Sequence, residues 1–333
     1  MPASSNILGC LIWQVPGMPV QGWDFDREIT SYQPGITTVA IGPFLGEPRL
    51  FAVQGPLSEA ECEERLDGLK EAEIMEPQGS SADNHIEKVE AVIERIRRDG
   101  LRKVVIARKE LLDLEIDIAK VFYLLCAAYP KAIVYVLHLE GEVWVGATPE
   151  TLLTAGEEGL RTMSLAGTRR PDGPEFTEKE YDEQLAVTES IEDILLGLGC
   201  SKIDARGPVP VSAGPIEHLQ TVIEASLPSS GSSIDWAKAL HPTPAVCGMP
   251  KKEALEIIGE IEDFDRSLYA GFIGWISDEN ARYYVNLRCM QVGKKHVALY
   301  AGGGITAQSD AKAEFAETVN KLETLKSVIQ TEH

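Results

Sequence analysis

The feature of this sequence that most restricts its fold is the order of its strand-like and helix-like segments. Strand-like runs follow one another without an intervening helix, as at Thr37–Ile41 and Leu50–Val53, and again at Ile133–Leu139 and Val143–Ala147. A parallel doubly wound sheet requires strict alternation of strand and helix, and that alternation is absent. The order predicts an α+β fold in which antiparallel sheets pack together with helices outside.

Apolar spacing predicts five helices. In the first, Ile86, Val89 and Ile96 recur at helical spacing and Gly100 supplies the stop. A long helix is expected over about Thr177–Leu198, because Thr177 followed by Glu180 has the form of a capping box. Three others are predicted near Trp236, over Lys251–Ile261 and over Asp310–Ile329.

The remaining segments predict strands and turns. A hairpin is expected between Thr151–Thr154 and Arg161–Leu165. Single strands are expected over Arg102–Arg108, Ala270–Ile276, Tyr283–Met290 and His296–Tyr300. A turn is expected at Gly302–Gly304, and the Gly/Pro/Ser-rich stretch near 207–233 carries no predicted element.

Charge and cysteine content restrict the partners and the compartment. The 333 residues include 52 acidic and 31 basic side chains, a formal net charge of -21. Such a field repels nucleic acid and anionic lipid, so neither is expected as a partner, and an anionic substrate would need local positive charge. No apolar run reaches the roughly 18 residues of a membrane-spanning helix. Six scattered cysteines without metal-like spacing predict free thiols and a cytoplasmic protein.

The chain is expected to form a single large domain. A polar segment, EPQGSSADN at 76–84, separates a strand-rich N-terminal part from the first clear helix. We assign residues 1–82 to the N-terminal part and residues 83–330 to a catalytic core of the same domain.

Two side chains are candidates for proton transfer. Lys103 shares a strand face with Val105 and Ala107, so partial burial could lower the pKa of its ammonium and make the amine a base. Glu150 follows a strand in Thr148-Pro149-Glu150, where a fixed backbone could hold a catalytic acid. A solvent-exposed lysine and a solvated turn are the alternatives.

Two pairs of glutamates are candidates for a Mg²⁺ site. Glu180 and Glu183 are three residues apart, as are Glu314 and Glu317, so each pair lies on one helix face. Four carboxylates from two helices suit a hard cation that prefers oxygen ligands. The alternatives are a capping role for Glu180 and a surface ion pair between Glu317 and Lys321.

Two further features could bind an anion. Glycines at Gly302–Gly304 before a helix would let backbone N–H groups approach a carboxylate, although a bare turn explains them equally well. A nucleotide site is a weaker alternative, because the GxGxxG spacing is absent. Arg288 is expected on a strand, facing the same way as Asn286 and Met290, where it would pair with a substrate carboxylate or an internal acid.

Taken together, these segments resemble the chorismate-utilising enzymes, the family of isochorismate synthase, salicylate synthase, anthranilate synthase component I and aminodeoxychorismate synthase. The resemblance covers about Asp83 to Leu325. The matching segments, in family order, are RKVVIARK (102–109), VGATPETLL (145–153), LAGTRR (165–170), KEYDEQLAV (179–187), IEHLQTVIEASL (216–227), HPTPAVCGMP (241–250), SLYAGFIGW (267–275), NLR (286–288) and AGGGITAQSDAKAEFAETVNKL (301–322). It implies the α+β chorismate-binding fold of anthranilate synthase component I.

The resemblance also implies roles for individual residues. Lys103 matches the lysine that activates water, and Glu150 the acid that protonates the departing C4 hydroxyl. Glu183 and Glu317 match the principal Mg²⁺ ligands, with Glu180 and Glu314 reaching the metal through water. The positions that match the surroundings of the substrate are Gly167, Thr168, His218, Tyr269, Arg288, Gly302, Gly304 and Lys321.

Within the family, the sequence looks most like isochorismate synthases of the menaquinone-pathway type, which are isomerases. Gln184 stands where several relatives have His, and the run GGGITAQSD resembles the same group. The short N-terminal part argues against a tryptophan feedback site, and no glutaminase subunit is expected. Salicylate, anthranilate and aminodeoxychorismate synthases remain alternatives, as does a catalytically silent binding module. Whether the product would serve menaquinone or siderophore biosynthesis stays open.

Overall fold

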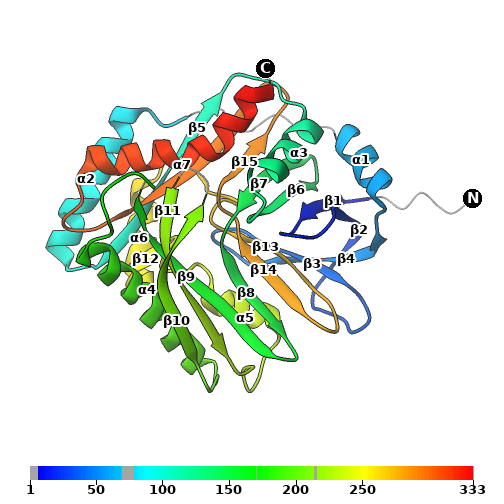
Figure 1. The fold of residues 1–333 in the computed structure, drawn as a ribbon, viewed down its shortest axis with the longest axis horizontal. Helices are drawn as coiled ribbons and strands as arrows, with labels where there is room; N and C mark the ends of the chain where they lie inside the picture. Colours follow the sequence, from blue (N-terminus) through cyan, green and yellow to red (C-terminus); the bar gives the residue numbers. More distant parts are fainter. Residues whose placement is uncertain (1–6, 70–78, 170, 214–215, 333) are drawn as a thin grey trace, which may run out of the picture.

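The computed structural model describes residues 7–69, 79–169, 171–213 and 216–332 (Figure 1). Positions 76–78 of the polar segment and Arg170 of the LAGTRR motif lie outside these residues. The helices within them are α1 (Glu59–Asp67), α2 (Ala82–Asp99), α3 (Ile118–Ala128), α4 (Glu178–Gly197), α5 (Ser233–Leu240), α6 (Lys251–Ile261) and α7 (Ala311–Glu332). The strands are β1 (Gly9–Gln14), β2 (Gln21–Ile29), β3 (Thr38–Gly42), β4 (Arg49–Pro56), β5 (Lys103–Leu112), β6 (Ile133–Leu139), β7 (Glu142–Thr148), β8 (Thr151–Gly156), β9 (Gly159–Arg169), β10 (Asp204–Ala213), β11 (Ile216–Ala225), β12 (Gly248–Met249), β13 (Phe272–Ile276), β14 (Ala281–Val285), β15 (Cys289–Val292) and β16 (Val297–Ile305).

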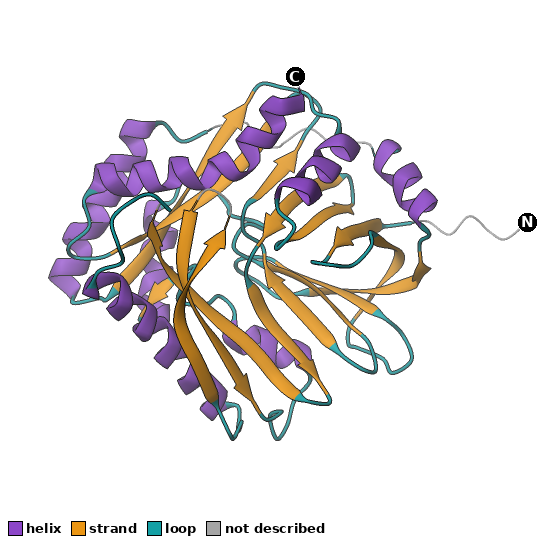
Figure 2. Ribbon diagram, viewed as in Figure 1, coloured by secondary structure: helices purple, strands orange, loops and turns teal. Residues whose placement is uncertain are grey.

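Over the described ranges the strands form one continuous sheet, which folds back on itself. Its order is β10-β11-β9-β8-β14-β13-β3-β4-β2-β1-β6-β7-β15-β16-β5-β12, and the pairings are antiparallel. Three strands separate β1 from β13 in this order, yet the rings of Trp13 and Trp275 lie 4.9 Å apart. The part of the sheet that contains β13 and the part that contains β1 therefore face each other as the layers of a sandwich, with helices around the outside (Figure 2). The predicted α+β fold of packed antiparallel sheets is confirmed.

Many strands are buried on both faces. In β6, Ile133, Tyr135 and Leu137 point into the sandwich, while Val134 and Val136 pack on the other side in a cluster with residues of α3 and α7. A strand covered on both faces reads as a continuous apolar run rather than an alternating one. This double burial explains why β5, β6 and β7 were recognisable from their sequence.

The two helices most clearly marked in the sequence begin and end as predicted. Gly100 caps α2 in the left-handed conformation, with φ of 74°, which costs glycine no Cβ clash. Thr177 caps α4 through a capping box with Glu180, whose carboxylate accepts from the Thr177 backbone N–H at 2.8 Å. The cap fixes where α4 begins, and with it the face on which Glu183 lies.

Several elements were not predicted from the sequence, among them helices α1 and α3 and strands β10 and β11. Helix α1 buries only Cys62 and Leu66 among acidic neighbours, so its apolar spacing is too sparse to recognise. Strands β10 and β11 form a hairpin within the stretch for which no element was predicted. Strand β10 lies at the edge of the sheet and carries Pro208 and Pro210, which are tolerated there because an edge strand leaves some N–H groups unpaired.

Two sequence predictions are wrong in a way that matters for the site. The single strand predicted over Tyr283–Met290 is broken at 286–288, where the chain leaves β14 and enters β15. Gly302–Gly304 do not form a turn but lie within β16, where Gly304 pairs with Val105 of β5. Arg288 is consequently not a strand residue, since it has a left-handed backbone with φ of 48° in the connecting segment.

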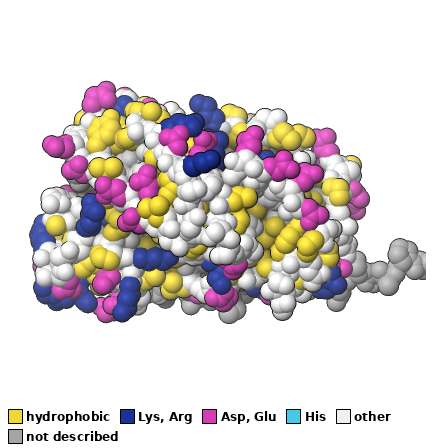
Figure 3. All heavy atoms as spheres, turned by 90° about the horizontal axis from the view of Figure 1, so that it is seen from below, with side chains coloured by type: hydrophobic (Ala, Val, Ile, Leu, Met, Phe, Trp, Pro, Cys, Tyr) yellow, Lys and Arg dark blue, Asp and Glu magenta, His cyan; other side chains and the backbone are white. Residues whose placement is uncertain are grey.

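The surface agrees with the charge pattern of the sequence. On the face shown in Figure 3, acidic and basic side chains are scattered among apolar ones and no basic patch gathers. Of the described helices, none is long and apolar enough to cross a membrane.

Candidate active site

One cavity brings together every site residue that the sequence singled out. It encloses about 980 Å³ of space, its open mouth included. Those of its lining residues that were predicted are Lys103, Glu150, Gly167, Thr168, Glu180, Glu183, His218, Tyr269, Arg288, Gly302, Gly304, Glu314, Glu317 and Lys321. They come from segments up to 218 residues apart in sequence, so the fold alone places them together.

Glu150 and Arg288 occupy two neighbouring crossovers between the layers of the sandwich. Through Pro149 and Glu150 the chain passes from β7 to β8, and through 286–288 it passes from β14 to β15. The crossovers are tied together, because the Val285 N–H donates to the Glu150 carbonyl and the Ala147 N–H donates to the Arg288 carbonyl, both at 3.0 Å. The acid and the guanidinium therefore share one frame at the cavity wall.

Lys103 begins β5 and is buried, with its Nζ donating to Glu183 Oε1 at 2.6 Å. Burial would lower the pKa of this ammonium, but the carboxylate of Glu183, with smaller effects from Glu317 and Glu314, outweighs burial and raises the pKa. The expectation that apolar surroundings lower the pKa of Lys103 is wrong for this structure. The neighbouring carboxylates, rather than burial, determine the charge of Lys103.

The glycines of β16 make room for the side chains of the cavity. A Cβ on Gly304 would lie 2.4 Å from Lys103 Cε, and a Cβ on Gly302 would lie 3.0 Å from the Tyr269 hydroxyl oxygen. Both distances are shorter than ordinary van der Waals contact. These glycines are explained by close approach of side chains rather than by a phosphate-binding turn, so the predicted anion-binding turn and the nucleotide alternative both lose their basis.

Glu150 is a buried carboxyl group that lines the cavity. It is 3% exposed, and in the described part of the chain its carboxyl group has no hydrogen-bond or ion-pair partner. Burial raises its pKa to about 7, although Lys103, Arg288 and Lys321 pull in the other direction. A carboxylic acid that keeps its proton near neutral pH is suited to general acid catalysis, as its position after a strand predicted.

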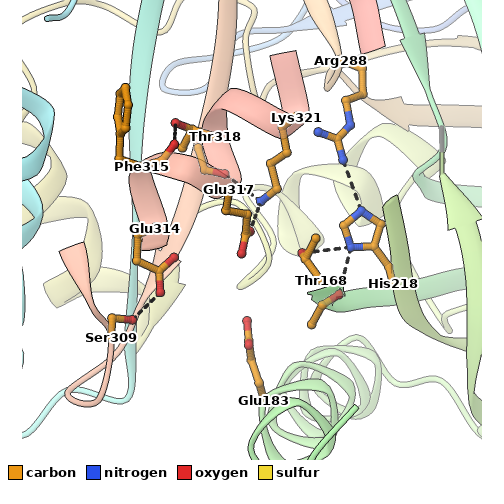
Figure 4. A network of polar contacts seen from close by, with 12 residues as sticks. Thr168, Glu183, His218, Arg288, Ser309, Glu314, Phe315, Glu317, Thr318 and Lys321 are labelled. Carbon is orange, nitrogen blue, oxygen red and sulfur yellow. Dashed lines mark hydrogen bonds and ion pairs between the residues drawn. The ribbon is translucent and has the colours of Figure 1, made fainter. Parts of the chain in front are cut away.

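Arg288 is oriented by a histidine from the opposite wall (Figure 4). Its Nη2 donates to His218 Nε2 at 3.2 Å, and His218 Nδ1 donates to the Gly167 carbonyl at 2.9 Å, with the Thr168 hydroxyl at 3.2 Å. Burial, together with Arg288 and Lys321, lowers the pKa of His218 to about 3, so its ring is neutral and can accept from the guanidinium. No acidic side chain in the described ranges forms an ion pair with Arg288, which leaves it available for a substrate carboxylate.

Four glutamates from α4 and α7 line the same cavity, and the carboxylate of one of them, Glu180, is held in the capping box with Thr177, as the alternative interpretation of the sequence predicted. Lys321 donates to Glu317 Oε1 at 2.6 Å and to the Gly302 carbonyl at 2.9 Å, while Ser309 donates to Glu314 at 2.6 Å. Burial would raise the pKa of Glu317, but Lys321 outweighs it and lowers the pKa. Within the described residues the acidic groups are not gathered into a ready-made cluster of three metal ligands. The donor set nevertheless fits Mg²⁺, because all four side chains are oxygen donors lining one cavity.

Other cavity residues had no signal in the sequence. Tyr300 stacks on Tyr269 with ring centres 5.5 Å apart, and Val246 and Leu287 complete the apolar wall. Apolar and aromatic side chains of this kind look like core residues in a sequence, because core and cavity wall use the same residue types. Only their proximity to Arg288 and Lys103 in the fold reveals them.

A buried acid, a lysine, an arginine with no acidic partner and four carboxylates around one cavity define a site for acid–base chemistry on a small anionic molecule. The chain matches the model of the family described as "Chorismate binding enzyme" over residues 57–330. It belongs to this family.

Named relatives support the same placement. The chain is 30% identical to isochorismate synthase MenF of Bacillus subtilis, over 92% of this chain and 71% of that protein. It is 32% identical to isochorismate synthase EntC of Escherichia coli K12, over 57% of this chain and 51% of that protein. The structure of MenF, the menaquinone-specific isochorismate synthase from Escherichia coli, superposes with a TM-score of 0.79 at 21% identity, covering 98% of this chain and 90% of that one, which shows the shared fold.

Proposed function

We propose that this chain is an isochorismate synthase, an isomerase that converts chorismate to isochorismate. The proposal rests on one observation above the others: Lys103, Glu150 and Arg288 line a single cavity, with Glu150 buried and holding its proton near neutral pH. The names of the relatives point to the same reaction.

The reaction needs a base and an acid acting on one ring. Lys103 takes a proton from a water molecule, whose oxygen bonds to C2 of chorismate while the C4 hydroxyl departs. Glu150 gives its proton to that hydroxyl, which leaves as water, so one water is consumed and one released. Lys103 is held as an ammonium by Glu183, 2.6 Å away, so it has to lose that proton to solvent before it can act as the base.

Substrate binding falls to the cationic groups of the cavity. Arg288, whose guanidinium is oriented by His218, suits two-point recognition of the enolpyruvyl carboxylate. Lys321 contributes a second positive charge at Gly302. These cations provide the local positive charge that an anionic substrate requires in a chain of net charge -21.

Glu183 and Glu317 would hold a Mg²⁺ ion, with Glu180 and Glu314 as its outer carboxylates. The ion would supply positive charge for the ring carboxylate of the substrate. We also propose that the enzyme acts alone, without a glutaminase subunit, in the cytoplasm. The six free cysteines support that compartment.

Product analysis tests the proposal. Purified protein is incubated with chorismate, with and without Mg²⁺, and the products are separated by chromatography. Isochorismate formed only with Mg²⁺ is the expected result. Salicylate fluorescence would identify a salicylate synthase instead. Anthranilate or aminodeoxychorismate appearing on addition of ammonium would identify one of those synthases, and no turnover with any of these additions would indicate a silent binding module.

A further inference from the structure

Asn286 joins three segments around the cavity although it does not line it. It is 1% exposed and lies in the crossover between β14 and β15, two residues before Arg288. Its Nδ2 donates to the Leu268 carbonyl at 2.8 Å, and its Oδ1 accepts from the Tyr135 hydroxyl. One side chain thus connects β6 and the segment before β13 to the crossover that carries Arg288.

The backbone of Asn286 is bound to the same neighbouring segment. Its N–H donates to the Gly271 carbonyl, and its carbonyl accepts from the Ala270 N–H, both at 2.8 Å. Tyr269 therefore lies between two residues, Leu268 and Ala270, that are each hydrogen-bonded to Asn286. The position of the Tyr269 ring in the cavity wall depends on this pairing.

Both joined segments hold unfavourable backbone conformations. Ala270 has φ of 59° and Arg288 has φ of 48°, left-handed values that side chains other than glycine adopt at a cost. Such conformations persist where surrounding contacts over-determine them. The hydrogen bonds of Asn286 are among those contacts, because they hold Ala270 directly and bind the crossover two residues before Arg288.

We propose that Asn286 is a positioning residue that fixes Tyr269 and Arg288 relative to each other and thereby sets the affinity for chorismate. This inference rests on the proposed function. Asn286 touches neither substrate nor metal ligands, and its effect passes through the two segments it joins. Loss of its hydrogen bonds should weaken substrate binding more than it slows the chemical step, because Asn286 bonds directly to the segment of Tyr269 and reaches Glu150 only through the backbone of Val285.

A matched control variant distinguishes an effect on substrate binding from a general loss of stability. Thr162 is also buried, and its hydroxyl donates to the Leu152 carbonyl at 2.7 Å, but it does not line the cavity. Asn286→Leu and Thr162→Val each remove buried hydrogen bonds with little change of shape, so both should lower the melting temperature. Asn286→Leu is expected to raise KM for chorismate about tenfold, whereas Thr162→Val leaves KM unchanged.

Tyr135→Phe provides the second measurement. It removes only the hydroxyl that donates to Asn286 Oδ1 and should raise KM about threefold. If Asn286→Leu does not fold, this variant decides the question. Wild-type protein that forms no isochorismate would refute the proposed function, and with it this inference. A working wild type in which Asn286→Leu and Tyr135→Phe match Thr162→Val in KM would overturn the positioning role alone.

Discussion

The two proton-transfer residues face one cavity but owe their charge states to different causes. Glu150 is buried with no partner, and burial alone raises its pKa to about 7. Lys103 is equally buried, yet its pKa moves away from neutrality because Glu183 lies 2.6 Å from its nitrogen. Burial favours the neutral form of both groups, and only the lysine has a close charge that reverses the effect. The presence or absence of a close ion-pair partner, rather than the polarity of the cavity wall, therefore explains why Lys103 and Glu150 differ in charge state.

Removing the acid should have the largest effect. Glu150→Gln keeps the shape of the side chain but cannot give a proton to the leaving hydroxyl, so kcat should fall by about 10²- to 10⁴-fold. Turnover of chorismate, measured by chromatography, checks this. Binding should persist, since the variant leaves Arg288 and Lys321 in place. A variant with kcat close to wild type would show that another group is the acid.

Replacing the lysine tests the other side of the comparison. Lys103→Met keeps much of the length and apolar character of the side chain but has no amine, so kcat should fall by about 10²-fold or more. The same change frees Glu183 from its ion pair. Circular dichroism establishes that the variant folds. Full activity in folded Lys103→Met would remove the lysine from the mechanism.

Displacing the lysine without removing it should have an intermediate effect. Gly304→Ala would put a methyl group 2.4 Å from Lys103 Cε, so the amine has to move and kcat should fall by about tenfold. Gly303→Ala is the matched control on the same strand, because its Cβ would meet Glu314 Oε2 at 3.4 Å, an ordinary contact. Equal kcat values for the two variants would contradict the packing argument.

The stability of the protein should also depend on pH, an effect that does not touch turnover. Between pH 4.5 and 7, folded Glu150 keeps a proton that the unfolded chain has released, so the free energy of unfolding falls as pH rises. The stabilisation is fully present below about pH 4.5 and is lost as pH rises through about 7. It amounts to about 3 kcal/mol, at 1.36 kcal/mol for each unit of pKa.

Urea unfolding of wild type and Glu150→Gln at a series of pH values measures this difference. The variant lacks the titrating carboxyl group. The free energy of unfolding of the wild type should therefore fall relative to that of Glu150→Gln between pH 5 and 8. Parallel curves would mean that the pKa of Glu150 is not raised by burial, and the contrast with Lys103 would disappear.

The sequence predicted the fold class, and which residues line the cavity, better than it predicted the local backbone conformation of the site. Helix α4 was predicted to within one residue at each end, and its start was recognisable because Thr177 and Glu180 form a cap whose effect is local. The break at Asn286 and the place of Gly302–Gly304 in β16 were missed, since both depend on partners elsewhere, namely Gly271, Tyr269 and Lys103. The pKa of Lys103 was predicted in the wrong direction for the same reason, because Glu183 lies 80 residues away.

The spacing between the two layers of the sandwich matters for the active site, because both crossovers that carry site residues span it. Glu150 and Arg288 both sit where the chain steps from one layer to the other, and the gap between the layers is filled by aromatic side chains that include Trp13, Trp275 and Tyr135. Replacing one of these aromatic side chains with a smaller one would let the layers approach each other and would shift Glu150 and Arg288 together. We therefore expect substitutions of these interior aromatic residues to affect the active site although they do not line its cavity.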